Sequence, residues 1–466
     1  MKFTNSKNGI VYGIFIILSV VVIAIVAFLF LSPTFERVSP KVSIEKEIYW
    51  NLQKPIKAII SDNNEIQSYN VTFDDGQKQI KLETKVVKNE KNLIELEILP
   101  PSFDEMSKPK DGNIKIDVFD ASKWNFFKGN ETVTNSKVII DRKSPIASVI
   151  GNSYLLRQGG CGVIIVEVSD ENLKDFYISF NDEELFELFP FYKKNYYISI
   201  IAWPVQIKEF KKVNLVAVDM AGNKTVTKVP FYIKSFTEKA DNIKVSDEFI
   251  QSVSKQVLEK SDMNIPSDPI DIFIKENKEL REKNVKTIRE VVRKNFSNNL
   301  VTSVNIKPFS RLENSATVAG FGERRSYMYN DQKIDEAWHL GNDWASTKRA
   351  PIKTFNDGKV IFKDYLGIYG NTIIIDHGLG VASLYAHTSS STVEVNDEVK
   401  AGDQIANTGD TGAVFGDHLH FGMLVQGIEV NSNEWLDYTW MKTNVTKTVE
   451  DAVKIINGIA KWNNEQ

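Results

Sequence analysis

The sequence predicts a mainly β protein, with one apolar helix at the N-terminus, two β-sandwich domains, a helical spacer and an all-β C-terminal domain. Three observations lead to this fold class. An uncharged stretch runs from Ile10 to Leu31, two later stretches with strand-like alternation match each other, and the periodicity becomes helical after Lys234 before short strands return. At 466 residues the chain is long enough for about three domains of ordinary size.

These patterns divide the chain into six segments. The proline and the charges between Ile139 and Ile146 are typical of a boundary between the two β domains. The predicted segments are an N-terminal tip with a membrane anchor at 1–33, a first β domain at 41–142, a second β domain at 143–235, a helical spacer at 240–300, an all-β domain at 301–440 and a C-terminal helix at 441–466.

The composition excludes one class of partner. The formal net charge of −4 comes from 57 basic and 61 acidic residues, and no basic stripe with interleaved aromatic residues is present. We therefore expect no nucleic-acid partner. Cys161 is the single cysteine, so it forms no intrachain disulfide and is expected to be a small buried apolar side chain.

The uncharged stretch near the N-terminus predicts a membrane anchor. As a helix, Ile10 to Leu31 would span roughly 33 Å, which is enough to cross a bilayer. No small-residue cleavage site follows, and Pro33 ends the helix, which favours an uncleaved anchor over a removed signal peptide. We expect a single-pass protein of the inner (cytoplasmic) membrane that contacts the lipid bilayer through residues 10–31. Because Lys2 and Lys7 precede the stretch, all later residues are expected on the periplasmic or extracytoplasmic side.

The two β domains are predicted from an internal repeat. The stretch ISDNNEIQSYNVTFDD, Ile60 to Asp75, matches VSDENLKDFYISFND, Val168 to Asp182, and both contain alternating apolar residues between turn residues. The second copy ends in VNLVAVDMAGNKTVTKVPFYI, which resembles the end of bacterial Ig-like domains. The resemblance implies two Ig-like β-sandwiches. No cluster of ionisable residues is expected in these domains. We therefore expect them to extend the reach of the chain or to bind envelope protein partners.

Helical periodicity follows the second β domain. Ser246 is predicted to cap a first helix, and a second is expected to run from Ser267-Asp268-Pro269 to about Lys294 with one apolar face. Two interpretations are open: a passive spacer, or a regulatory arm that packs near a cleft of the C-terminal domain. A last amphipathic helix, carrying Val449, Val453, Ile456 and Ile459, is expected to close the C-terminal domain.

The histidines indicate a metal site. All five histidines lie in the last third of the chain, and HLGND and HLHFGML place His339, Asp343 and His420 on short strands, with a bend at Gly341. Two imidazoles and one carboxylate are a typical ligand set for one tetrahedral Zn²⁺ per chain, with the fourth position left for water. His418 would stand beside the metal, and His387 could serve as general acid or base.

Several segments between Ala319 and Asp437 resemble the lysostaphin/LytM-type zinc metalloendopeptidases. The segments are FGERR, HLGNDWA, IIIDHGLGVASLYAH, VKAGDQIANTGDTG and GDHLHFGMLVQG. The resemblance implies that His339, Asp343 and His420 bind zinc and that His387 and His418 are catalytic. This chain has Val414-Phe415-Gly416 and Gly422 where many members have Ser-Thr-Gly and glutamate, which affects the shape of the groove more than the metal site.

Taken as a family member, the chain is expected to be a membrane-anchored zinc metalloendopeptidase. It would hydrolyse peptide bonds in the stem or cross-link peptides of bacterial peptidoglycan. The alternative is a non-catalytic envelope scaffold that recruits or activates another cell-wall hydrolase. His377, at the turn after IIID, is expected to bond to the backbone and bind no metal, and Arg324 and Arg325 are expected to be solvated.

Overall fold

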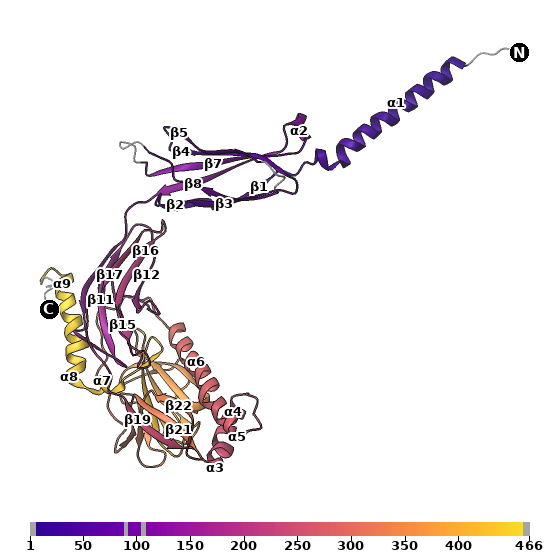
Figure 1. The fold of residues 1–466 in the computed structure, drawn as a ribbon. Coiled ribbons are helices and arrows are strands. Elements are labelled where there is room, and N and C mark those ends of the chain that lie inside the picture. The colour runs from indigo at the N-terminus through magenta and orange to yellow at the C-terminus, as the bar shows by residue number, and fades with distance from the viewer. Residues whose placement is uncertain (1–5, 88–91, 104–108, 460–466) are drawn as a thin grey trace. The chain divides into compact units, whose positions relative to one another are not determined.

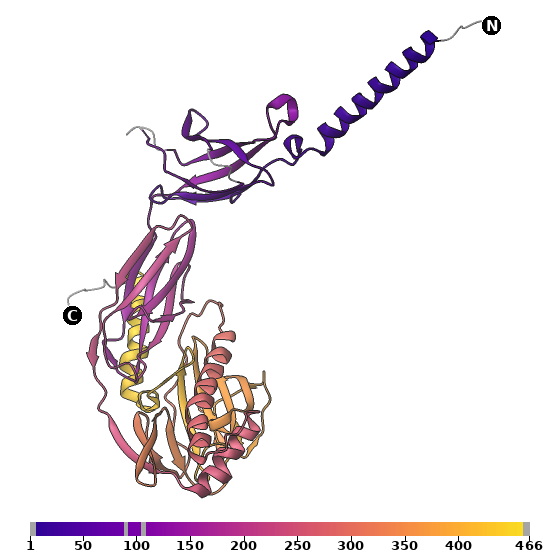
Figure 2. The ribbon, with the colours of Figure 1, turned by 45° about the vertical axis from the view of Figure 1, so that its right-hand side comes forward.

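A computed structural model describes residues 6–87, 92–103 and 109–459 of the chain (Figures 1 and 2). The chain forms two compact units. One consists of Met1–Ser144 with Asp219–Asn223, and the other of Pro145–Val218 with Lys224–Gln466. The fold is mainly β, with an apolar N-terminal helix, so the predicted fold class is confirmed.

The N-terminal helix α1 covers Ser6–Leu31 and is followed by a 3₁₀ turn at Pro33–Phe35. Its residues Ile10–Leu31 have a mean hydropathy of 3.4 and are not buried by the rest of the chain. It is the one helix in the described residues that is long and apolar enough to cross a membrane. Lys2, used to predict the orientation, lies outside the described residues.

The first β domain consists of two sheets that share one core. Tyr69, Val71 and Phe73 of β4 are all buried, as their alternation predicts. The smaller sheet has the order β1 (Lys41–Ser43), β3 (Ile56–Ser61), β6 (Leu93–Ile98). The larger sheet has the order β2 (Glu47–Trp50), β8 (Glu131–Ile140), β7 (Asp111–Asp120), β4 (Ile66–Asp74), β5 (Gln79–Val86).

The second β domain has two four-stranded sheets. One has the order β14 (Phe189–Pro190), β15 (Tyr196–Ala202), β11 (Cys161–Ser169), β9 (Ile146–Asn152). The other has the order β13 (Glu184–Phe186), β12 (Leu173–Phe180), β16 (Val213–Asp219), β17 (Lys224–Lys228). The core of this sandwich continues into the C-terminal domain, since buried Val163 and Phe186 belong to the same apolar cluster as Trp344 and Phe421. Its short strands β10 (Leu155–Arg157) and β18 (Tyr232–Lys234) pair in parallel.

The segment predicted as a helical spacer begins with a strand. β19 (Lys239–Lys244) pairs in parallel with β21 (Glu323–Tyr329), which pairs with β22 (Gln332–His339). The stretch KADNIK has no apolar alternation, and its strand conformation comes from hydrogen bonds to β21, which local sequence does not reveal.

The helices that follow are packed against the C-terminal domain. Ser246 caps the first helical run, as predicted, and Asp268 caps the second, which begins where it was expected. Buried Phe273 and Leu280 share an apolar cluster with Ile374 and Leu384 of the large C-terminal sheet. The helical stretches are α3 (Asp247–Phe249), a π-helical stretch η2 (Ile250–Ser254), α4 (Lys255–Lys260), α5 (Pro269–Ile274), a π-helical stretch η3 (Lys275–Leu280) and α6 (Arg281–Lys294).

The C-terminal domain is built on an eight-stranded sheet. A 3₁₀ turn, η4 (Gly367–Tyr369), precedes β26. The strand order is β20 (Ala316–Ala319), β23 (Asn342–Ala345), β31 (Leu419–Val425), β27 (Val381–Ala386), β26 (Asn371–Asp376), β25 (Gly358–Tyr365), β29 (Glu398–Val399), with β32 (Ile428–Val430) also paired to β31. A small sheet contains β24 (Pro351–Lys353), β30 (Gln404–Asn407) and β28 (Ser390–Ser391).

The last helix, α9 (Lys447–Ile456), follows α7 (Ser432–Leu436), α8 (Tyr438–Trp440) and the π-helical η5 (Met441–Thr446). It lies along β9 and β11 of the second sandwich, so the expectation that it closes the C-terminal domain is wrong (Figures 1 and 2). Ile459 is not on its apolar face either. Gly458, with φ 72°, ends the helix, and Ile459 beyond it is 75% exposed.

A buried carboxyl group of α7 joins the second sandwich to the C-terminal domain. Glu434 Oε2 accepts a hydrogen bond from the backbone N–H of Cys161 at 3.1 Å. A Cβ atom on Gly160 would lie 2.5 Å from Glu434 Oε1, so only glycine leaves room for the carboxyl group. Burial raises the pKa of Glu434 from 4.5 to about 7.

The raised pKa of Glu434 predicts a loss of stability with rising pH. The folded protein holds this proton more tightly than the unfolded chain, so the stabilisation is complete below about pH 4.5 and is lost as the pH rises through about 7. The shift corresponds to about 3 kcal/mol. We expect Glu434→Gln, which cannot ionise, to match the wild-type Tm at pH 5 and to exceed it by several degrees at pH 8 in calorimetry.

Glu336 is the control for this experiment, because hydrogen bonds from Arg324 and Lys333 lower the pKa of this exposed carboxyl group to about 2. Its stabilising effect is present at neutral pH, so Glu336→Gln should gain no Tm at pH 8. A Glu434→Gln variant whose Tm tracked that of the wild type at both pH values would contradict the prediction.

Candidate metal centre and active site

The large sheet brings the predicted site residues together from strands far apart in sequence. Asp343 on β23 pairs with His420 on β31, and His420 also pairs with Ala386, the last residue of β27. His387 directly follows that strand. His339 ends β22 in the neighbouring sheet, and the predicted bend at Gly341 separates it from β23.

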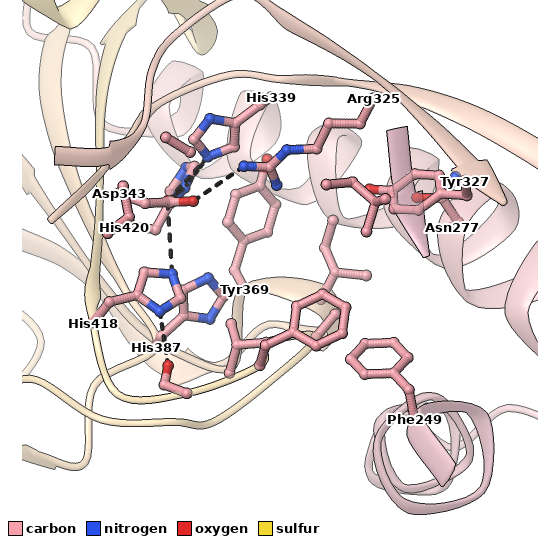
Figure 3. A pocket seen from close by; sticks show the side chains of 18 of the residues that line it. Phe249, Asn277, Arg325, Tyr327, His339, Asp343, Tyr369, His387, His418 and His420 are labelled. Atoms are coloured by element: carbon pink, nitrogen blue, oxygen red, sulfur yellow. Dashed lines mark hydrogen bonds and ion pairs between the residues drawn. The ribbon is translucent and has the colours of Figure 1, made fainter. Parts of the chain in front are cut away.

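The three predicted ligands form a compact triangle (Figure 3). His339 Nε2 lies 3.0 Å from Asp343 Oδ1 and 3.1 Å from His420 Nδ1, and His420 Nδ1 lies 2.8 Å from Asp343 Oδ1. All three residues are buried. Such a convergence of donor atoms can hold a metal ion.

The protonation states suit metal binding. His339 Nδ1 donates to the carbonyl of Gly320 at 2.8 Å, which leaves Nε2 with its lone pair toward the other two residues. Burial lowers the pKa of His420 to about 4, so its imidazole is neutral at pH 7. Burial alone would raise the pKa of Asp343, but His339 and His420 lower it well below its usual range. Two imidazoles and a carboxylate fit Zn²⁺.

His387 and His418 lie beside this triangle. Their ring centroids are 4.9 Å apart, and His418 Nε2 lies 3.7 Å from Asp343 Oδ1. Their Nδ1 atoms each lie 2.8 Å from a backbone carbonyl, that of Thr411 for His387 and that of Gly416 for His418. Since a carbonyl only accepts, each Nδ1 carries a proton, and in the neutral tautomer that this contact selects Nε2 is the nitrogen that can accept one. Burial, with His418 and His420 nearby, lowers the pKa of His387 well below its usual range.

The expectation that Arg325 is solvated is wrong, because its side chain is mostly buried and binds a residue of the site. Its Nη2 lies 3.2 Å from Asp343 Oδ2, the carboxylate oxygen turned away from the two histidines (Figure 3). The contact holds the orientation of the carboxylate. Strand alternation could have revealed it, because Glu323 pairs with His339 and Arg325 lies on the same face of β21. Arg324 points the other way and forms surface ion pairs.

A cavity of about 400 Å³ extends from the histidines to the helical segment. Phe249, Phe273, Glu276, Asn277 and Arg281 of that segment line it. The ring of Phe249 stacks on Phe415 at a centroid distance of 4.4 Å. Of the two interpretations of the segment, the packing near the cleft is therefore observed, and the departure at Val414-Phe415-Gly416 lies in the cavity wall.

His377 behaves as predicted and takes no part in the triangle. Its Nδ1 lies 2.8 Å from the backbone carbonyl of Asp357, and its Nε2 lies 2.8 Å from Ser383 Oγ. Both ring nitrogens are therefore occupied. His377 is therefore a suitable control residue for substitutions of the ligand histidines.

The expectation that the sandwiches hold no cluster of ionisable residues is wrong. Glu36, Asp62 and Asp120 offer carboxylate oxygens within 4.8 Å of one another. Three distant segments supply these residues, so no local pattern in the sequence could show the cluster.

Gly341 is required by the position of His420. A Cβ atom on Gly341 would lie 2.5 Å from His420 Nε2 and 2.7 Å from the carbonyl oxygen of Phe421. We expect Gly341→Ala to displace the imidazole and to weaken zinc binding by on the order of 10- to 100-fold in a chelator competition assay. Gly422→Ala, on the strand that carries His420, is the control, because its Cβ would make an ordinary contact of 3.5 Å with Leu384. Equal zinc affinity in both variants would refute the steric argument.

Comparisons with known proteins identify the C-terminal domain. The family model of Peptidase family M23 matches residues 337–432. The chain is 36% identical over 107 residues to the DD-carboxypeptidase/endopeptidase Mpg of Neisseria meningitidis, which covers 22% of this chain and 25% of that protein. It is 34% identical over 110 residues to the murein hydrolase activator EnvC of Escherichia coli, which covers 24% of this chain and 26% of that protein. The chain thus spans about a quarter of the length of these curated relatives.

Among solved structures, the catalytic domain of lysostaphin from Staphylococcus simulans is 27% identical, with a TM-score of 0.24. The similarity covers 27% of this chain and 94% of that domain. All five histidines and Asp343 fall inside the segment that the family model matches. Residues 337–432 of this chain, which contain the three candidate ligands, therefore match Peptidase family M23.

Proposed function

We propose that this chain is a membrane-anchored zinc metalloendopeptidase that hydrolyses peptide bonds of bacterial peptidoglycan. One observation carries the proposal: His339, Asp343 and His420 converge within 3.1 Å of one another while His387 and His418 stand beside them. A structural metal site needs no further histidines. The names of the relatives supply the substrate class, since several are named as peptidoglycan DD-endopeptidases.

In this proposal His339, Asp343 and His420 hold one zinc ion per chain. When bound, zinc supplies a Lewis acid that polarises the scissile carbonyl and lowers the pKa of a water molecule toward neutrality. Arg325 keeps Asp343 Oδ1 directed at the two imidazoles by binding Oδ2. The cavity lined by the helical segment receives the peptide.

His387 and His418 handle the protons. An unprotonated Nε2 takes the proton of the attacking water as the new C–O bond forms, and the same proton passes to the amine as the peptide C–N bond breaks. The backbone carbonyls of Thr411 and Gly416 hold each ring in the tautomer that this step requires. Burial keeps His387 unprotonated at neutral pH.

The helix α1 is proposed as an uncleaved anchor in the inner membrane, with the domains on its periplasmic or extracytoplasmic side. The hydropathy of Ile10–Leu31 supports this proposal, as does an envelope substrate. The two sandwiches would give reach or bind envelope proteins.

A second candidate function is a non-catalytic activator of another cell-wall hydrolase. The similarity to EnvC, named as a murein hydrolase activator, favours it. The Phe249–Phe415 stack at the cavity also fits a domain whose cleft is occupied by its own helices. The filled ligand and base positions favour the enzyme.

Digestion of purified sacculi by the full-length protein tests the two functions. The enzyme is expected to release muropeptides with new amino and carboxyl termini inside the peptides, identified by mass spectrometry. EDTA should abolish the release, and added zinc should restore it. If the protein alone releases nothing but increases release by a second cell-wall hydrolase, the activator function replaces the enzyme.

A further inference from the structure

The loop between β7 and β8 of the first sandwich is longer than its counterpart in the second. In each sandwich an Asn closes the loop by donating its backbone N–H to an Asp Oδ1 and its side-chain N–H to Oδ2, at 2.7 to 2.8 Å. Asp120 and Asn130 stand ten positions apart, whereas Asp219 and Asn223 stand four apart. The repeat therefore shows that the first loop, residues 121–129, carries an insertion that closing the sandwich does not need.

The inserted residues are aromatic and basic. The loop contains the short turn α2 (Trp124–Phe127), in which Phe126 is 92% and Phe127 is 75% exposed. Lys123 and Lys128 flank the turn and are exposed as well. Asn125, Phe126 and Phe127 all have φ between 51° and 66°, a left-handed conformation that costs free energy for phenylalanine. The rings of Phe126 and Phe127 are not part of the core of the sandwich, and the core does not require the left-handed backbone conformation of these residues.

The loop lies against the C-terminal end of α1. The rings of Phe30 and Trp124 are 6.3 Å apart, and the guanidinium of Arg37 stands 3.7 Å from the first and 4.1 Å from the second. The backbone N–H of Lys123 donates to the carbonyl of Thr34 at 2.8 Å. Because Phe30 belongs to the apolar span Ile10–Leu31, the loop lies at the level where that span ends (Figure 1).

We propose that loop 121–129 inserts its aromatic rings into the headgroup region of the bilayer that α1 crosses. Aromatic side chains are enriched at that depth, and the flanking lysines can extend their ammonium groups to lipid phosphates. The loop and α1 together give the first sandwich two attachments to one membrane surface. This inference rests on the proposed anchoring of α1.

Spin labels on the full-length chain test the insertion. Cys161, which is buried, is replaced by serine, and a nitroxide is placed at Phe126→Cys or, as a control, at Gln77→Cys. Gln77 is exposed and lies in the turn that follows β4. This turn is at the other end of β4 from the loop, because Ile66 pairs with Asp120 beside the loop and Asp74 pairs with Asn113, roughly 25 Å further along the strand. Both proteins are reconstituted in vesicles of phosphatidylethanolamine and phosphatidylglycerol.

The label at 126 is expected to lose collisions with a water-soluble nickel chelate and to gain collisions with oxygen, while the label at 77 keeps its collisions with the chelate. Changing Trp124 and Phe127 to serine should restore the collisions of the label at 126 with the nickel chelate. If the chain does not float with the vesicles, both the anchor and the insertion are overturned. If it floats and the label at 126 collides with the chelate as often as the label at 77, the anchor stands and the insertion is wrong.

Discussion

Replacing His420 by alanine is expected to abolish zinc binding and turnover together. The imidazole supplies one of three donor atoms that converge within 3.1 Å, and its neighbour Asp343 would lose the imidazole that lies nearest to its Oδ1 atom, at 2.8 Å. A site with two remaining protein ligands holds zinc poorly, because the protein ligands of an open three-ligand site act together. Metal analysis after gel filtration and a muropeptide turnover assay measure both effects.

His377→Ala is the matched control for His420→Ala. Its ring bonds to Asp357 and Ser383 and contacts no ligand, so the variant should keep one zinc per chain and near wild-type turnover while losing some stability. A His420→Ala protein that retained metal and rate would show that the assignment of ligands is wrong.

Replacing His387 by alanine is expected to separate metal binding from catalysis. The three donor atoms of His339, Asp343 and His420 stay in place, so zinc should remain near one per chain. Turnover should fall by on the order of 10²- to 10⁴-fold, the usual contribution of a positioned acid or base. The same zinc analysis and turnover assay, run beside His420→Ala, give the comparison.

His418→Ala should resemble His387→Ala, because both rings hold Nδ1 against a backbone carbonyl and neither belongs to the triangle of closest contacts. Circular dichroism confirms that each variant is folded. Loss of zinc from His387→Ala would show that His387 is a metal ligand and not one of the two catalytic histidines. Full turnover in both variants would show that neither His387 nor His418 transfers protons in the reaction.

Much of the site could be predicted from local sequence because strands have a period of two. The spacing in HLGND and HLHFGML predicts short strands that carry His339, Asp343 and His420, and in the structure these residues lie on β22, β23 and β31. Local rules also identified the cap Ser246 and the start of the second helix near Asp268, and both side chains accept from backbone N–H groups a few residues ahead. The bonds of His377 follow from its place at the end of a strand.

The mainly β fold class, the apolar helix, the repeat and the candidate ligands could be predicted from the sequence alone, because each depends on residues close together in the chain. Three other features follow only from tertiary contacts: KADNIK is a strand, α9 covers the second sandwich, and Arg325 reaches Asp343. Those outcomes depend on hydrogen bonds and packing between segments distant in sequence, where the partner, and not local propensity, sets the conformation. The cavity wall is such an outcome as well, since Phe249 and Phe415 meet only when the helices fold onto the sheet.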